Sequence, residues 1–179
     1  NILRETSFAT VMVTHDRNEA QALSHQVAVI MNGQIAQVGT PREIFSSPAS
    51  EEIAKFIGME NVLEGVVASN NNCIADINVG GHFVVGVSSC QAGGAVNIFI
   101  RPEDITISLS EPAGSARNVF PGRITSMVPT GPLVRVGLDC GFPLVALITR
   151  MSSDELGLDI GKNVYASFKS TAIHVNTIN

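Results

Sequence analysis

The chain has 179 residues, of which 45% are hydrophobic and 15% charged; this composition supports a packed core and excludes global disorder. No apolar run approaches the ~20 residues of a transmembrane helix. The first residues lack a basic segment followed by an apolar one, which excludes a signal peptide. The first residue is not Met, and we expect the sequence to be part of a longer one.

The net charge of -5 is unevenly distributed along the chain. Residues 1–114 carry five Lys/Arg against twelve acids, whereas residues 115–179 carry six against four. The basic excess of the last third is too small for a nucleic-acid interface, but it fits a local site for a small anion. The three cysteines have no metal-ligand spacing, so we expect reduced thiols at Cys73, Cys90 and Cys140.

The first predicted element is a buried strand over residues 9–14, an apolar run rich in β-branched residues. Asp16 follows as the N-cap of a helix that extends to about Leu23. Glu19 lies three residues after Asp16 and completes a capping box.

A hairpin is predicted next, with strands at residues 26–31 and 34–38. The dipeptide Asn32-Gly33 between them is a strong signal for a two-residue turn. Thr40-Pro41 then opens a helix, because Thr is a good N-cap and Pro is tolerated at the first helical position.

A further short helix is expected at residues 50–57, with Ser50 as its N-cap. Its apolar side is expected to hold Ile53, Ala54, Phe56 and Ile57. After Gly58 the sequence changes to short alternating strands separated by Gly, Asn and Pro, which is typical of a small barrel or sandwich.

The barrel-like segment is internally repeated. Residues 61–66 parallel residues 118–123, and residues 99–105 parallel residues 167–173. Two similar barrels, or one barrel of two lobes, fit this repeat, with residues 110–114 as the linker. One helix is expected at residues 152–156, with Ser152 as its N-cap.

Three segments of residues 9–57 occur in a characteristic order. They are Val11-Met12-Val13-Thr14-His15-Asp16, Ala28-Val29-Ile30-Met31-Asn32-Gly33 and Gln37-Val38-Gly39-Thr40-Pro41. Together they resemble the switch-histidine end of ABC-transporter ATPases. The resemblance implies that His15 is catalytic: it would hydrogen-bond the γ-phosphate of ATP and help to position the attacking water. A histidine that merely ends a strand in a loop is the alternative.

Several parts of an ATPase are missing from the sequence. The chain contains no G-x-x-x-x-G-K-[ST] loop, no Walker-B Asp-Glu pair and no Leu-Ser-Gly-Gly segment. Because these parts hold the phosphates and Mg²⁺, we expect no cofactor and no ATPase activity for this chain alone. ATP and Mg²⁺ would bind to a longer parent protein, in which His15 forms one part of the active site.

A second group of motifs covers residues 115–175. Its pieces are Ser115-Ala116-Arg117-Asn118, Ile148-Thr149-Arg150-Met151-Ser152 and Lys169-Ser170-Thr171. They resemble the molybdate/tungstate-binding Mop domain of the TOBE group. The resemblance implies a homodimer with oxyanion sites where barrels from two chains meet. The expected oxyanion-binding residues are Ser115, Arg117, Asn118, Thr149, Ser152, Lys169 and Ser170.

The chemistry of these side chains agrees with an oxyanion ligand. Tetrahedral dianions only accept hydrogen bonds, so their site needs hydroxyls, N–H groups and cations rather than a base. Each residue also has a simpler interpretation. Ser115 and Asn118 can be turn residues, Ser152 can be only a helix cap, and Lys169 can be a solvated charge on an edge strand.

The first repeat has different chemistry at the matching position. Residues 101–104 read Arg-Pro-Glu-Asp, and the carboxylates of Glu103 and Asp104 would repel a dianion, so we expect no oxyanion site there. The other histidines, His25, His82 and His174, have no metal-ligand spacing, and we expect no metal site.

These patterns predict a mostly β chain, with two small OB-like TOBE/Mop barrels or lobes after a short α/β remnant of an ABC ATPase domain. The expected division is residues 1–59 for the incomplete nucleotide-binding domain, 60–112 for the first lobe and 113–179 for the oxyanion-binding barrel. The expected function is regulation of an importer's ATP-binding subunit by molybdate or tungstate.

The expected partners are the oxyanion, a second copy of the chain and membrane permease subunits. The permease would hold the protein at the cytoplasmic face of the cell membrane, and no nucleic-acid partner is expected. The alternative is a structural TOBE module that dimerises the ATPase of an importer for sulfate, a sugar or a polyamine, without a molybdate or tungstate site.

Overall fold

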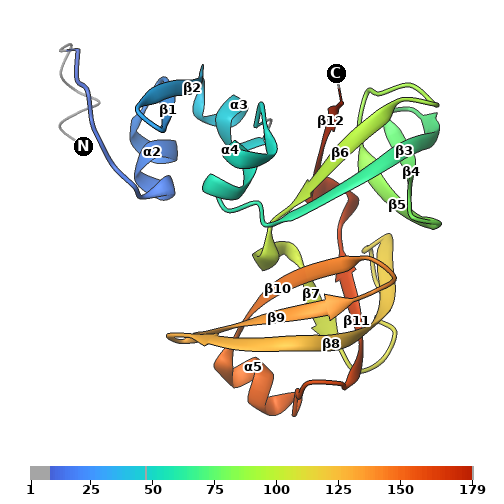
Figure 1. The fold of residues 1–179 in the computed structure, drawn as a ribbon. Coiled ribbons are helices and arrows are strands. Elements are labelled where there is room, and N and C mark those ends of the chain that lie inside the picture. Colours follow the sequence, from blue (N-terminus) through green and yellow to red (C-terminus); the bar gives the residue numbers. More distant parts are fainter. Residues whose placement is uncertain (1–8, 47, 179) are drawn as a thin grey trace. The chain divides into compact units, whose positions relative to one another are not determined.

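The computed structural model describes residues 9–46 and 48–178. The chain divides into two compact units, unit 1 at residues 1–57 and unit 2 at residues 58–179 (Figure 1). Strands predominate among the described residues, which confirms the predicted mostly β fold class.

Unit 1 consists of short helices around one antiparallel hairpin. Helix α2 (Arg17–Leu23) precedes strands β1 (Val27–Met31) and β2 (Gln34–Gly39), which pair with each other. Helices α3 (Pro41–Ser46) and α4 (Glu51–Phe56) follow. The order of these elements is the predicted one.

The predicted turn and helix caps of unit 1 are confirmed. Asn32 and Gly33 have φ angles of 51° and 75°, as a tight hairpin turn requires. Thr40 and Glu43 form a reciprocal capping box: the Thr40 hydroxyl accepts from the Glu43 N–H at 3.3 Å, and the Glu43 carboxylate accepts from the Thr40 N–H at 2.7 Å. The hydrogen bonds that the Thr40 N–H and the Thr40 hydroxyl donate to the carboxylate, at 2.7 and 2.9 Å, lower the pKa of Glu43. The Ser50 hydroxyl caps α4 at 3.2 Å.

Two expectations for unit 1 are wrong. Residues 9–14 form no strand, and Val11 and Val13 are 93% and 95% exposed. A strand needs a neighbouring edge to satisfy its N–H and C=O groups, and the described part of unit 1 has only the β1–β2 sheet. Phe56 is 63% exposed rather than on the buried side of α4.

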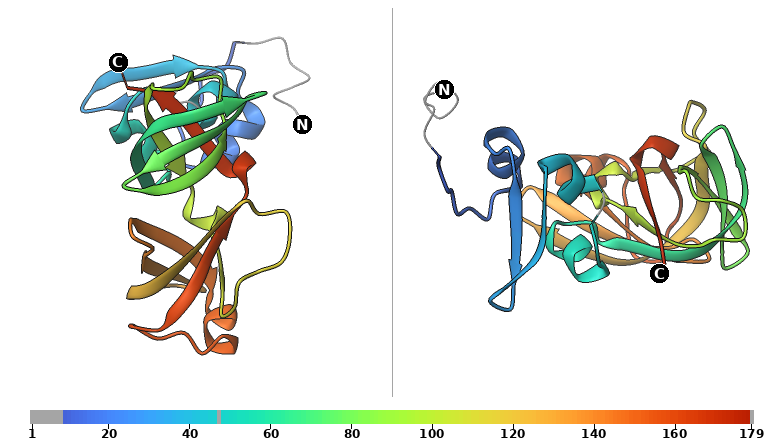
Figure 2. Two further views of the ribbon diagram at one scale, coloured as in Figure 1. Left: turned by 90° about the vertical axis from the view of Figure 1, so that its right-hand side faces the viewer. Right: turned by 90° about the horizontal axis from the view of Figure 1, so that it is seen from above.

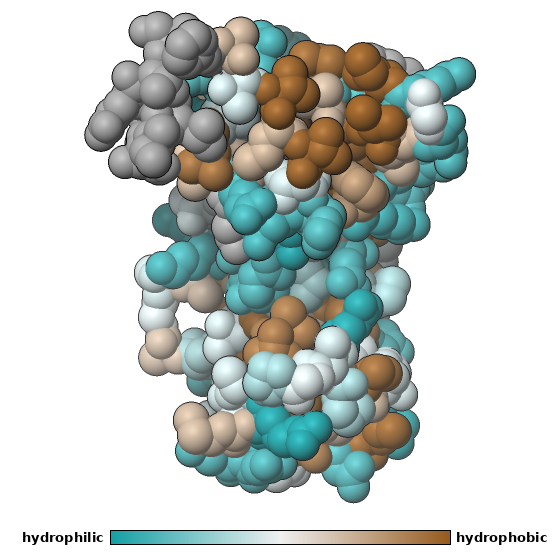
Figure 3. Space-filling view, turned by 90° about the vertical axis from the view of Figure 1, so that its left-hand side faces the viewer, coloured by the Kyte–Doolittle hydropathy of each residue, from teal (hydrophilic) through white to brown (hydrophobic). Residues whose placement is uncertain are grey.

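Unit 1 leaves several large apolar side chains uncovered. Ile30, Ile35 and Val38 of the hairpin are all more than half exposed. Figure 3 shows apolar side chains gathered on the upper part of one face of the molecule.

Unit 2 contains two five-stranded antiparallel sheets. The first has the order β12-β6-β3-β4-β5 and the second the order β10-β9-β8-β11-β7. The strands of the first half are β3 (Asn61–Asn71), β4 (Ile74–Val79), β5 (His82–Val87), β6 (Ala95–Ile100) and β7 (Thr106–Ser108). Those of the second half are β8 (Asn118–Thr130), β9 (Leu133–Asp139), β10 (Pro143–Thr149), β11 (Asn163–Phe168) and β12 (Ile173–Thr177). The short helices of the unit are η1 (Pro102–Asp104), α5 (Arg150–Glu155) and η2 (Ser170–Ala172).

The two sheets exchange their last strands. Strand β7 leaves the first half to pair with β11, and β12 returns from the second half to pair with β6. Figure 2 shows the red β12 among the green strands of the first sheet. The register is equivalent in both pairings, because Ser167 lies opposite Thr106 and Phe99 lies opposite His174. The predicted ranges 60–112 and 113–179 thus each contribute to both sheets.

The internal repeat is confirmed by strands β3 and β8. Each begins with a buried asparagine, Asn61 or Asn118. Each also has a β-bulge at the same distance from that asparagine, directly after Val67 in β3 and directly after Ile124 in β8. Gly65 and Gly122 occupy equivalent positions where the chain packs closely. A Cβ added at Gly65 would lie 2.7 Å from an Ile77 methyl carbon, and one at Gly122 would lie 2.5 Å from the sulfur of Cys140. Buried apolar residues from both halves form one cluster.

Candidate oxyanion site

The predicted site residues fall into two groups within unit 2. The first group, which we call the lysine corner, consists of Ser115, Arg117, Lys169 and Ser170. Asn118, the first residue of β8, lies opposite Phe168, the last residue of β11. Arg117, just before β8, and Lys169, just after β11, therefore lie at neighbouring strand ends. Both are exposed, and Ser170 begins η2 directly after Lys169. Ser115 lies in the exposed connection before β8.

The second group, which we call the threonine corner, consists of Thr149 and Ser152. Thr149 rather than Ser152 is the N-cap of α5, because its hydroxyl accepts from the Ser152 N–H at 3.1 Å. The two hydroxyl oxygens lie 2.8 Å apart. The prediction of Ser152 as the cap is therefore wrong, since the helix begins at Arg150 and Ser152 lies within its first turn.

The two corners lie at opposite ends of the second sheet. Thr149 lies opposite Leu133, and Leu133 lies opposite Thr130 at the far end of β8 from Asn118. Figure 1 shows α5 at the lower end of this sheet, whereas the connection from β11 to β12 lies at its upper end. The structure therefore does not bring the two predicted groups together within one chain.

Asn118 differs from the other predicted residues because both polar atoms of its amide already bond to the backbone. The side chain is buried, with its Oδ1 accepting from the Val85 N–H at 2.7 Å and its Nδ2 donating to the Val85 carbonyl at 2.9 Å. Asn61 makes the matching contacts with Val145, at 2.6 and 3.0 Å. Each amide thus pairs with an edge strand of the other half, β5 or β10, as a neighbouring strand would. We call these two contacts the amide clamps.

The charges of the lysine corner are uncompensated. Neither Arg117 nor Lys169 forms an ion pair with a carboxylate among the described residues. The matching position in the first repeat holds Glu60, which forms an ion pair with Arg135 of β9. Only the second half therefore presents two free cations beside hydroxyl groups.

The corresponding corner of the first half contains Arg101, Pro102, Glu103 and Asp104. Burial raises the pKa of the Asp104 carboxyl, and Arg101 partly opposes this effect. His174 enters from β12, and burial together with Arg101 lowers its pKa. Mixed charges of this kind do not favour a dianion.

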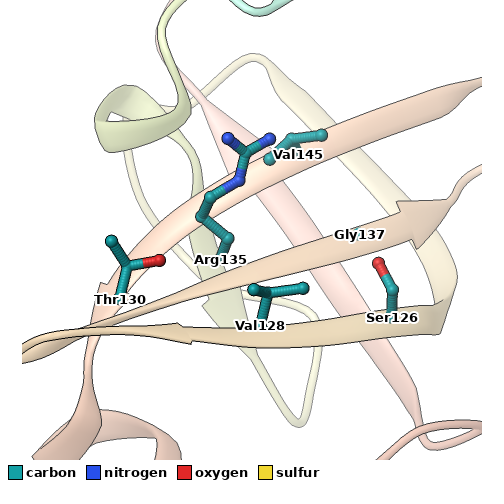
Figure 4. Close-up of a pocket in the computed structure, with 6 residues that line it drawn as sticks. All are labelled: Ser126, Val128, Thr130, Arg135, Gly137 and Val145. Atoms are coloured by element: carbon teal, nitrogen blue, oxygen red, sulfur yellow. The ribbon is translucent and has the colours of Figure 1, made fainter.

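A groove on the outer face of the second sheet is a further candidate for a binding site. It is lined by Ser126, Val128, Thr130, Arg135, Gly137 and Val145, and none of these is a predicted site residue. Figure 4 shows the Arg135 side chain reaching over the sheet towards Val145. Because Arg135 pairs with Glu60, its charge is already compensated, and the groove is a weaker candidate for an anion.

His15 is exposed just before α2. The turn around it is held by Thr14, whose hydroxyl donates to the Glu19 carboxylate at 2.6 Å and accepts from the Asp16 N–H at 3.0 Å. The predicted capping contact from Glu19 N–H to Asp16 is also present, at 3.3 Å. The role of His15 therefore stays the one implied by its sequence context.

The amide clamps are the features that sequence reasoning missed. Asn118 stays predicted as an oxyanion-binding residue, but the sequence did not indicate that it and Asn61 bond to distant edge strands. The recurrence of asparagine at the first position of both repeats was the available signal. His82 also has a structural role, since its ring packs edge-on against Phe142 and Phe120, at 5.6 and 6.5 Å between centroids.

Other kinds of site find little support in residues 9–46 and 48–178. No group of three His, Cys, Asp or Glu side chains in that range could hold a metal ion. No helix in the described chain has the length and apolar character needed to cross a bilayer. The thiol of Cys140 is buried, and this burial, with the nearby Asp139, raises its pKa to about 11.

Residues 114–175 match the TOBE domain family. The molybdate/tungstate import ATP-binding protein WtpC of Pyrococcus horikoshii is 41% identical over 173 residues, which are 96% of this chain and 48% of that protein. The spermidine/putrescine import ATP-binding protein PotA of Trichodesmium erythraeum is 36% identical over 140 residues, 73% of this chain and 36% of that protein.

Among solved structures, the cytoplasmic molybdate-binding protein ModG with molybdate bound superposes with a TM-score of 0.62. The match covers 66% of this chain and 96% of that chain at 20% identity, and at this identity it shows a shared fold. The chain spans about half the length of the curated relatives that match nearly all of it. Residues 114–175 thus match the TOBE domain, and nearly the whole chain is similar to ATP-binding subunits of molybdate/tungstate importers.

Proposed function

We propose that this chain is a regulatory region of an importer's ATP-binding subunit and binds molybdate or tungstate between two copies of itself. The observation that carries the proposal is the separation of the lysine and threonine corners at opposite ends of the second sheet. One chain cannot close both corners around a small ion. Two chains can, if the lysine corner of each meets the threonine corner of the other.

The chemistry of the two corners complements a tetrahedral dianion. Arg117 and Lys169 are exposed cations at neighbouring strand ends, so they repel each other until an anion lies between them. The hydroxyls of Ser115 and Ser170 add donors on the same side, and the partner copy would add those of Thr149 and Ser152. Neither corner contains a carboxylate, which suits a ligand that accepts hydrogen bonds and carries two negative charges.

A dimer built in this way would respond to the anion. In a two-fold dimer each contact occurs twice, so two copies would form two equivalent sites. An anion that binds only the assembled arrangement stabilises it by linkage. Plentiful oxyanion in the cytoplasm would thereby favour one arrangement of the ATP-binding subunits and reduce further import.

The longer protein would supply the catalytic machinery. ATP and Mg²⁺ would bind outside this chain, and His15 would contribute a contact to the γ-phosphate. The similarity to import ATP-binding proteins supports this proposal. The subunit would then act at the cytoplasmic face of a membrane, bound to permease subunits.

Mixing two inactive variants tests the shared site. Lys169→Glu reverses a charge in the lysine corner, and Ser152→Asp places a carboxylate in the threonine corner while remaining favourable in the first turn of α5. Each variant alone should lose tungstate binding in calorimetry. If they dimerise at random, an equimolar mixture should regain about one quarter of the wild-type sites, because each heterodimer has one corner pair intact.

The outcomes separate the proposal from its alternatives. A mixture that regains no binding would show that both corners do not meet across two chains. A wild-type chain that binds neither tungstate nor molybdate would favour a structural TOBE module for another solute. The similarity to a spermidine/putrescine import protein keeps that second function open, and a parallel titration with sulfate and spermidine would identify it.

A further inference from the structure

We infer that Asn118 is a positioning residue for the oxyanion site rather than one of its ligands. This inference rests on the proposed function and concerns how the lysine corner is held in shape. Asn118 is the residue between Arg117 and the rest of β8, and it lies opposite Phe168, the residue before Lys169. Any shift of Asn118 therefore moves both cations.

The amide of Asn118 is fixed from both sides by the same residue. It accepts from the N–H of Val85 at 2.7 Å and donates to the carbonyl of Val85 at 2.9 Å. The side chain is buried, with a relative exposure of 1%. Because the oxygen and the nitrogen of this amide both bond to Val85 and the side chain is almost completely covered, we place it behind the anion rather than in contact with it.

Val85 connects this clamp to the other flank of the lysine corner. The next residue, Gly86, packs against β12 so closely that an added Cβ would lie 3.4 Å from methyl carbons of both Ile173 and Val175. Strand β5 also contacts η2, the turn that begins at Ser170. Strand β5 thus contacts both sides of the lysine corner. It holds the start of β8 through the hydrogen bonds of Asn118, and it packs against β12, which follows η2 directly.

This arrangement makes anion affinity in the second half depend on a strand of the first half. Sites for small ions require their donors to be held within a fraction of an ångström, because each misplaced donor weakens the charge-assisted contacts. Releasing Asn118 from β5 would leave all the donors present but let Arg117 and Lys169 move relative to Ser170.

Asn61 provides a matched control within the same molecule. It forms the equivalent amide clamp with Val145, but the corner beside it carries Glu60 instead of a free cation. Asn61→Ala and Asn118→Ala both remove an amide clamp, and Asn61→Ala also removes a hydrogen bond to the Ile100 carbonyl at 3.2 Å, so it is the more severe test of stability alone. Only Asn118→Ala is expected to disturb the lysine corner.

The test compares tungstate affinity and thermal stability in the 179-residue chain. Asn118→Ala should weaken tungstate binding by about tenfold or more in calorimetry, whereas Asn61→Ala should change it by less than about twofold, although both variants melt at a lower temperature. Gly86→Val adds two γ-methyl groups beyond a Cβ that would already contact Ile173 and Val175, so it should crowd β12 and also weaken binding. If circular dichroism shows that Asn118→Ala does not fold, the affinity of Gly86→Val is measured in its place.

Equal losses of affinity in the Asn61→Ala and Asn118→Ala variants would overturn the inference, because they would reflect stability alone. Unchanged affinity in both Asn118→Ala and Gly86→Val would overturn it as well. Failure of the wild-type chain to bind tungstate would instead reject the proposed function, so the two failures are distinguishable.

Discussion

The two halves of unit 2 share one fold but carry opposite chemistry at matching corners. Both begin with an amide clamp, both bulge at the same position, and each lends a strand to the other. At the matching corner, however, Glu60 in the first half corresponds to Arg117 in the second, and Glu103 corresponds to Thr171. The first corner is satisfied by an ion pair within the chain, and the second is left open to an external anion.

The comparison separates what the fold requires from what a site requires. Buried asparagines, glycines at close contacts and apolar core residues recur in both halves because the shared backbone needs them. The exposed corner residues differ because no packing constraint fixes them, so a site can arise in one repeat and be absent from the other.

Removing β12 should have the largest effect, since it tests whether the halves depend on each other. A chain that ends after Ala172 loses the buried Ile173 and the pairing with β6. Loss of one buried Ile side chain alone costs about 2–5 kcal/mol, so we expect a total loss of at least about 4 kcal/mol in urea unfolding. Hydrogen exchange should accelerate in β3 and β6. A chain that ends after Thr177 is the control, and faster exchange confined to the second half would contradict the strand exchange.

The amide clamps should contribute equally to stability if the two halves are equivalent. Asn61→Ala and Asn118→Ala each leave an N–H and a C=O group of an edge strand without their partner. We expect each variant to lose about 2–3 kcal/mol of unfolding free energy. The exposed Asn163, changed to Ala, should cost less than about 0.5 kcal/mol. Because Asn61 also donates to the Ile100 carbonyl at 3.2 Å, a somewhat larger loss is expected for Asn61→Ala, and a much larger loss for Asn118→Ala would contradict the equivalence of the two clamps.

Replacing the cation of the lysine corner by the carboxylate found in the first repeat should strongly reduce its affinity for anions. Arg117→Glu places a carboxylate where Glu60 stands in the first repeat, so a dianion is repelled instead of attracted. We expect tungstate affinity to fall by about 100-fold in calorimetry, with stability nearly unchanged because the side chain is exposed. Lys55→Glu in unit 1 makes the same change in net charge, and a comparable loss of affinity in that variant would contradict a local site.

The smallest effect is expected from pH at the first corner. Burial and Arg101 lower the pKa of His174 from its ordinary 6.5. As the pH falls through this value, the unfolded chain binds the proton before the folded one, so stability decreases. The raised pKa of Asp104 acts in the opposite direction at lower pH, because there the folded chain binds its proton first. His174→Gln should therefore reduce the fall in melting temperature between about pH 7 and 5. If the pH dependence of the melting temperature is unchanged in His174→Gln, the pKa of His174 does not differ between the folded and unfolded chains.

Sequence reasoning succeeded where an element depends on nearby residues. The Asn32-Gly33 turn and the caps at Thr40 and Ser50 were predicted because each involves contacts within about four residues. It failed for residues 9–14, since a strand forms only when another strand lies beside it. The cap of α5 was misplaced by three residues because Thr149 and Ser152 are both good caps, and their local signals are alike.

The sequence by itself determined the repeat, the mostly β fold and the set of hydroxyls and cations available to an anion. Tertiary structure alone decided that β7 and β12 change sheets, that Asn118 binds Val85, 33 residues away along the chain, and that Lys169 and Thr149 lie at opposite ends of a sheet. Hydropathy and turn signals are local, whereas the choice of partner for an edge strand depends on which distant strand completes its hydrogen bonds.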